Sequence, residues 1–170
     1  MKGFTLVELL VVIGIIVILM TAALVAINPF KQFAMANNAS RWSGVTTTMN
    51  AVSQRMVDKK GIFGTDANCT AVLPTNCPGT GDIIPTGNNV CMGVGTLAVV
   101  DAGKCDSFFD MYGCLVPEYI GVIPFDPQTG KFTSSANYNT RYTIKCDATS
   151  KRITIVSPDA QLSETITITR

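Results

Sequence analysis

The hydrophobic and polar positions of this chain divide it into a strongly apolar front and a mixed remainder. Leu9 to Ile27 is an unbroken run without a charged side chain. A helix rises about 1.5 Å per residue, so the run would extend about 29 Å, close to the hydrocarbon thickness of a bilayer. The pattern predicts a membrane-spanning helix. Lys2 ahead of it predicts that the N-terminus stays on the cytoplasmic side.

A second helical pattern follows the apolar run. Its apolar residues recur at spacings of three and four, as on one face of a helix: Trp42, Val45, Met49, Val52 and Met56. Polar residues fall largely off that face: Arg41, Asn50, Gln54 and Arg55. We expect this stripe to pack beneath an exterior domain, because such stripes are far more often core than a cofactor groove.

One residue is expected to interrupt the helical region and another to end it. Pro29 removes a backbone hydrogen bond and predicts a break or bend there. Gly61, directly after Lys59 and Lys60, is a plausible C-cap. We therefore expect one helix over residues 4–28 and an amphipathic continuation over residues 29–60.

The remainder divides at about residue 120. Residues 61–119 are irregular and rich in Pro and Gly, with short apolar pieces at 94–100 and 108–116 that predict a strand and a helical turn or two. Residues 141–146, 151–156 and 165–169 alternate polar and apolar, which predicts antiparallel strands, the first two joined by a turn at 147–150. The predicted class is α+β: a long N-terminal helix packed on a small C-terminal antiparallel sheet over residues 120–170.

Composition excludes several functions. The net charge is +1 and only 15% of residues are charged, so no basic field favours nucleic acid. Because histidine is absent, Ser-His and Cys-His nucleophile pairs and most zinc sites are excluded. The sequence carries no Gly-rich phosphate loop and no Gly-x-Ser-x-Gly. We expect a protein that is not an enzyme and holds no cofactor.

All six cysteines lie beyond the apolar front: Cys69, Cys77, Cys91, Cys105, Cys114 and Cys146. None forms a Cys-x-x-Cys pair, which argues against metal or thioredoxin-like chemistry. An even number behind a membrane segment predicts disulfides formed in an oxidising compartment. The alternative is six reduced cysteines in a cytosolic protein, and the sequence alone does not choose the pairing.

Calcium is the metal that the acidic residues bring into consideration. Asp101, Asp106 and Asp110 lie close together, and Asp126 precedes the predicted sheet. Calcium prefers several oxygen ligands, but an EF-hand spacing is absent and dispersed aspartates are more often caps or solvated turns. We therefore expect no metal site.

The residues ahead of the apolar run decide between kinds of membrane segment. A secretory signal usually has a shorter apolar core followed by an Ala-x-Ala site, and the nearest candidate here is the poor Leu24-Val25-Ala26. A plain anchor would not place the carboxylate of Glu8 at the edge of the run, because a charge in the membrane is costly and usually marks function. A Glu that reaches back to the membrane edge is the alternative.

Gly3-Phe4-Thr5-Leu6-Val7-Glu8-Leu9-Leu10 resembles, without a gap, the signature of type IV prepilins and pseudopilins. That resemblance implies a leader of residues 1–3, cleavage by a prepilin peptidase between Gly3 and Phe4, and methylation of the new Phe4 amine. It also implies that Glu8 sets the register of assembly by pairing with the Phe4 amine of a neighbouring subunit. A shorter likeness covers Ile123 to Gly130, which resembles the Pro-x-Asp-Pro segment of pseudopilins.

Two functions remain open. The first is a pilin or pseudopilin subunit of a type IV pilus or type II secretion-like filament. Its partners would be copies of itself or related pilins, the prepilin peptidase and inner-membrane assembly machinery. The precursor would lie in the inner membrane and the filament in the periplasm or outside the cell. The second is a single-span protein with a disulfide-stabilised binding module that never polymerises.

Overall fold

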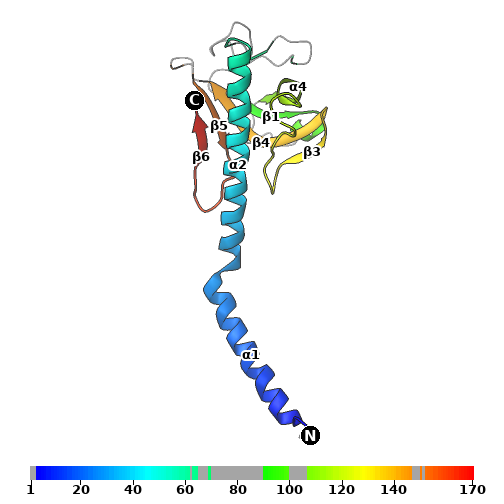
Figure 1. Cartoon of the computed structure of the whole chain (residues 1–170), viewed down its shortest axis with the longest axis vertical. Coiled ribbons are helices and arrows are strands. Elements are labelled where there is room, and N and C mark those ends of the chain that lie inside the picture. Colours follow the sequence, from blue (N-terminus) through cyan, green and yellow to red (C-terminus); the bar gives the residue numbers. More distant parts are fainter. Residues whose placement is uncertain are drawn as a thin grey trace. The chain divides into compact units, whose positions relative to one another are not determined.

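The computed structural model describes residues 3–61, 63–64, 69, 90–99, 107–146, 150 and 152–170. It divides into two compact units, Met1–Ala36 and Asn37–Arg170. Figure 1 shows the N-terminal helices and the C-terminal sheet, coloured along the sequence. A long helical region, α1 (Leu6–Ile27) and α2 (Pro29–Asp58), is followed by a C-terminal sheet, so the predicted α+β class is confirmed.

Asn28 separates α1 from α2. It adopts a left-handed conformation, with φ of 46°, at the C-cap of α1. Its side-chain oxygen then accepts a hydrogen bond from the Lys31 N–H at 3.3 Å, which caps the start of α2. Pro29 follows as the first residue of α2, where its missing N–H costs nothing and its fixed φ suits a helix. The break therefore lies at Asn28, and Pro29 opens the second helix.

The buried face of α2 is only partly the stripe that the sequence predicts. Val45, Met49 and Val52 are fully buried in the core, whereas Trp42 is 37% exposed. Arg41 and Arg55 are also fully buried, so the prediction that these arginines fall off the packed face is wrong. Both share the helical spacing of the stripe, and the burial is tolerated because each guanidinium has hydrogen-bond partners.

The last turn of α2 closes one residue earlier than the Gly61 C-cap prediction places it. Lys60 adopts φ of 54° and donates its N–H to the Val57 carbonyl, while Gly61 donates to the Met56 carbonyl at 2.7 Å. This pair of bonds is a Schellman motif. Lys60, not Gly61, occupies the position that usually favours glycine, and Gly61 follows with φ of 89°.

The sheet is mixed, with the order β2-β1-β4-β5-β6 and with β3 also paired to β4. Its strands are β1 (Val90–Val94), β2 (Ser107–Phe109), β3 (Lys131–Ser134), β4 (Asn137–Cys146), β5 (Ile153–Ser157) and β6 (Ile166–Thr169). The pairs β4–β5 and β5–β6 are antiparallel as predicted. Every strand pair within residues 120–170 is therefore antiparallel. The sheet as a whole is mixed because β1 and β2, which lie ahead of that region, pair in parallel.

Two short helices interrupt the region that the sequence leaves irregular. The piece expected as a strand at 94–100 contains α3 (Thr96–Val99), and β1 ends at Val94 just before it. The piece at 108–116 contains the end of β2 and α4 (Tyr112–Leu115). The turn predicted at 147–150 falls mostly outside the described residues.

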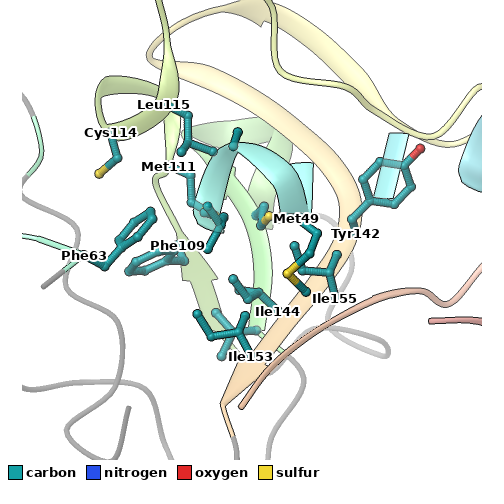
Figure 2. Packing of buried hydrophobic residues seen from close by; sticks show 14 of the residues in the cluster. Met49, Phe63, Phe109, Met111, Cys114, Leu115, Tyr142, Ile144, Ile153 and Ile155 are labelled. Atoms are coloured by element: carbon teal, nitrogen blue, oxygen red, sulfur yellow. The ribbon is translucent and has the colours of Figure 1, made fainter. Parts of the chain in front are cut away.

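The hydrophobic core of the second unit lies between α2 and the sheet. Figure 2 shows Met49 of α2 near Ile144 of β4 and Ile155 of β5, and Phe63 next to Phe109. The helix approaches β4 closely at Gly44: a Cβ there would lie 2.5 Å from the Tyr142 hydroxyl oxygen. Glycine is therefore required at position 44 if Tyr142 keeps its place.

Candidate assembly site and its anchorage

The residues that the sequence singles out at the N-terminus lie together at the start of α1. Gly3, Phe4 and Thr5 precede the helix, and the Phe4 side chain is 92% exposed. Thr5 is the N-cap, and Glu8 lies in the first turn. Gly3 and Phe4 therefore form an exposed, non-helical segment ahead of α1.

Glu8 and Thr5 form a reciprocal capping box. The Thr5 N–H and the Thr5 hydroxyl both donate to Oε2 of Glu8 at 2.8 Å, and the Glu8 N–H donates to the Thr5 hydroxyl at 3.3 Å. This arrangement satisfies donors at the helix start that otherwise lack partners. Within a single chain the Glu8 carboxylate is thus held at the N-terminus of α1.

The rest of α1 offers a continuous apolar surface. None of its residues is buried, and it is long and apolar enough to cross a membrane. Thr21 donates its hydroxyl to the carbonyls of Val17 and Ile18, so its polar group is satisfied within the helix. Past Glu8, then, α1 presents no charge to its surroundings.

A buried ion pair joins α2 to the loop ahead of the sheet. Arg41 Nε donates to Oδ2 of Asp126 at 2.6 Å, and both side chains are almost fully buried. The N–H groups of Gln128 and Thr129 donate to the other oxygen, Oδ1, at 2.9 Å. Through Asp126, the Pro-x-Asp-Pro segment therefore binds Arg41 of α2.

The cost of burying that pair is offset by the surrounding hydrogen bonds. Burial by itself would raise the pKa of Asp126, but the hydrogen bonds from Arg41 and from the Thr129 and Gln128 N–H groups outweigh it and lower the pKa. Arg41 also donates to Asn38 and Gln128. Asp126 therefore stays charged and paired with Arg41 of α2.

The same stretch of α2 holds the loop before β6. Asn38 donates to the Gln161 carbonyl and to Glu164, and the Trp42 indole donates to Glu164 at 2.7 Å. Sequence reasoning missed this polar anchorage. Asn38, Arg41 and Trp42 are polar groups spaced along one helix face, but their partners lie between 85 and 126 residues away in the chain.

The far end of α2 is fixed by the second buried arginine and by a disulfide. Arg55 donates to the carbonyls of Phe63 and Cys114 at 2.7 and 2.9 Å and lies over the Phe63 ring. Cys114 is bonded to Cys69. The Cys69–Cys114 disulfide and Arg55 therefore tie the chain after α2 to α4.

Only some of the remaining cysteines and of the aspartates considered for calcium lie within the described residues. Cys91 and Cys146 are also disulfide-bonded, while Cys77 and Cys105 lie outside the described residues, as do Asp101 and Asp106. Asp110 accepts from the Tyr138 hydroxyl and the Tyr112 N–H. Within the described part of the chain, no group of three or more His, Cys, Asp or Glu could hold a metal ion.

Comparison with known families adds one finding at the N-terminus. Residues 1–24 match the family model described as the prokaryotic N-terminal methylation motif, the class III signal peptide of type IV pilins. Comparisons with curated proteins and with solved structures gave no match. The motif and the apolar helix fit a membrane-anchored precursor. The match covers the first 24 of 170 residues and supports a type IV pilin-like precursor.

Proposed function

We propose that this protein is a structural subunit, without catalytic activity, of a type IV pilus or a type II secretion-like filament. A prepilin peptidase removes residues 1–3, and the mature chain assembles with copies of itself or related pilins through α1. The methylation motif at residues 1–24 carries the proposal. The exposed Gly3–Phe4 segment and the unburied apolar surface of α1 support it.

Glu8 sets the register in this proposal. Cleavage after Gly3 creates an amine on Phe4, and in a filament that amine pairs with Glu8 of the adjacent subunit. Burial of both charges removes most of the net gain from their attraction, but a subunit out of register leaves a charge unpaired, at a cost of about 3–5 kcal/mol. The pair therefore contributes alignment more than affinity.

The capping box offers a competing account of Glu8, since a carboxylate that only caps α1 would need no neighbour. Substitution by Gln separates the two accounts, because Gln also forms capping boxes but carries no charge. We expect Glu8→Gln and Glu8→Leu both to insert in the membrane and both to lose most filament yield. Thr5→Ala removes the cap, costs about 1 kcal/mol of helix stability, and should leave assembly largely intact.

The measurement is the yield of sheared filaments from a host with the assembly machinery, normalised to the protein in its membranes. Wild-type yield from Glu8→Gln together with loss from Glu8→Leu would reduce Glu8 to a helix cap. Undiminished yield from both variants would remove the register role altogether. An unaltered chain that never forms filaments would favour the single-span binding module.

A further inference from the structure

A pocket of about 430 Å³ lies between the end of β1, the short helix α4 and the turn that joins β3 to β4. We call it the α4 pocket. The side chains that line it are apolar except for Asp110, Tyr112 and Ser135. The pocket lies within the unit Asn37–Arg170, apart from the N-terminal residues on which the proposed function depends.

The Asp110 carboxylate is held in a fixed orientation at this pocket. Its Oδ1 accepts hydrogen bonds from the Tyr138 hydroxyl at 2.9 Å and from the Tyr112 N–H at 3.0 Å. Tyr138 is fully buried, and its hydroxyl is itself fixed by bonds from the Met111 and Tyr112 N–H groups. Oδ2 of Asp110 accepts no hydrogen bond from the described residues, and the residue is exposed. An oriented carboxylate oxygen is therefore available to a donor from outside the chain.

An aromatic ring lines the same pocket as this carboxylate. The Tyr112 ring stacks on Phe132, with 5.8 Å between the ring centroids, and packs at a tilt against Tyr138 at 6.1 Å. Contacts with two other rings therefore hold it in place. Carboxylates and aromatic faces both attract cations. In the part of the chain that the structure describes, no lysine or arginine lines the pocket, so the matching cation has to come from a ligand.

The other walls of the pocket distinguish between classes of ligand. Val94, Val116 and Ala136 are apolar, and they suit the hydrocarbon stem of a long basic side chain. A sugar would bury hydroxyl groups against these walls without hydrogen-bond partners, and the Asp110 carboxylate would repel an anion. Arginine fits better than lysine, because its planar guanidinium both donates to a carboxylate and stacks on an aromatic ring.

We propose that the α4 pocket binds an arginine side chain displayed on a partner protein. The guanidinium donates to Oδ2 of Asp110 and lies against the Tyr112 ring, while its hydrocarbon stem packs on Val94 and Val116. This inference goes beyond the proposed function and does not rest on it, because the pocket lies wholly within the unit Asn37–Arg170. Its failure would leave the role of α1 in assembly unaffected.

The first test needs no variant. The full chain, isotope-labelled for NMR in detergent micelles at low ionic strength, is titrated with the tripeptide Gly-Arg-Gly, acetylated and amidated at its ends. The amide signals of Tyr112 and Gly113 should shift saturably. The same peptide with citrulline, which has the shape of arginine without its charge, should bind about tenfold more weakly. Equal binding of the two peptides, or shifts caused by methyl mannoside and not by the arginine peptide, would overturn the proposal.

A pair of variants tests the assignment of Asp110. Asp110→Asn keeps a side-chain oxygen for the Tyr138 hydroxyl and the Tyr112 N–H but removes the charge, so it should lose most of the preference for arginine over citrulline. Glu118→Gln removes the same charge at an exposed acid outside the α4 pocket and should keep the preference. A preference that survives in full in Asp110→Asn, or disappears in Glu118→Gln, would contradict the role of Asp110.

Discussion

Asp126 and Arg41 form a buried ion pair that joins α2 to the loop ahead of the sheet. Removing one partner of a buried ion pair leaves the other charge uncompensated, at a cost of about 3–5 kcal/mol. We expect Asp126→Ala to lower the unfolding free energy by an amount in this range, measured by denaturant titration of detergent-solubilised protein. Glu118→Gln, at an exposed acid, is the control. Equal stability of the two variants would show that the pair contributes nothing.

The same contact predicts an acid-sensitive stability. The folded-state pKa of Asp126 lies below its ordinary value, so the folded protein keeps the carboxylate charged where the unfolded chain would bind a proton. The stabilisation is therefore complete above the unfolded pKa of about 4 and is lost as the pH falls through the folded pKa. Thermal unfolding between pH 6 and 2 should show a shallower decline for Asp126→Asn than for the unaltered chain.

Removing the hydroxyl group from each of two buried tyrosines should affect stability to different extents. The Tyr138 hydroxyl donates to Asp110 and accepts from the Met111 and Tyr112 N–H groups. The Tyr142 hydroxyl has no hydrogen-bond partner among the described residues, and burial, with the nearby Asp126 charge, raises the pKa of Tyr142 to about 12.

Tyr138→Phe should cost about 1–3 kcal/mol because it leaves buried groups unsatisfied. Tyr142→Phe should change the unfolding free energy by less than about 0.5 kcal/mol, since the hydroxyl that it removes makes no such bond. Both variants keep the aromatic ring, so denaturant titration compares hydrogen bonding alone. A larger loss from Tyr142→Phe than from Tyr138→Phe would contradict the assignment.

How far the sequence predicts the site depends on how local its signals are. Gly3, Phe4 and Glu8 lie in one contiguous motif whose meaning needs no tertiary contact, so they can be recognised directly. Arg41 cannot be placed in this way. An isolated arginine on a helix is read as solvated, and only Asp126, 85 residues later in the chain, makes its burial favourable.

At the scale of elements, the end of α2 offers a paired test. Lys60 holds a left-handed conformation that costs non-glycine residues about 1–2 kcal/mol. Lys60→Gly should therefore stabilise the protein by up to about 1 kcal/mol after the added freedom of the unfolded chain is subtracted. Gly61→Ala, at φ of 89°, should destabilise it by about 1 kcal/mol. Shifts of the unfolding temperature with the same sign would contradict the Schellman geometry.

The strands divide into those that sequence could predict and those that it could not. β5 and β6 alternate polar and apolar residues, and their burial alternates with them because one face packs on the core. β4 alternates in sequence, although it is buried throughout residues 138–144. β1 is buried at four of its five positions and β2 has three residues. Neither shows a period of two, and their parallel pairing depends on a connection that no local pattern encodes.

At the scale of the whole molecule, the disulfides predict that reductant lowers the stability of the unit Asn37–Arg170. Cys69–Cys114 closes a loop of 45 residues in sequence, and such a cross-link contributes about 2–4 kcal/mol. We expect exported protein to show no alkylation by a thiol reagent until it is reduced, and to unfold at a lower temperature afterwards. Alkylation of Cys69 or Cys114 in unreduced protein would contradict the oxidising compartment.

A role as a filament subunit depends on how the N-terminus of the chain is processed in the cell. The methylation motif at residues 1–24 carries the proposed processing, and α1 is useful for assembly only if it is retained. The most direct measurement is therefore the intact mass and N-terminal sequence of the protein recovered from its host's membranes. We predict a chain that begins at Phe4 with a methyl group on its amine. A chain that still begins at Met1, or one cleaved near Ala26, would contradict the account.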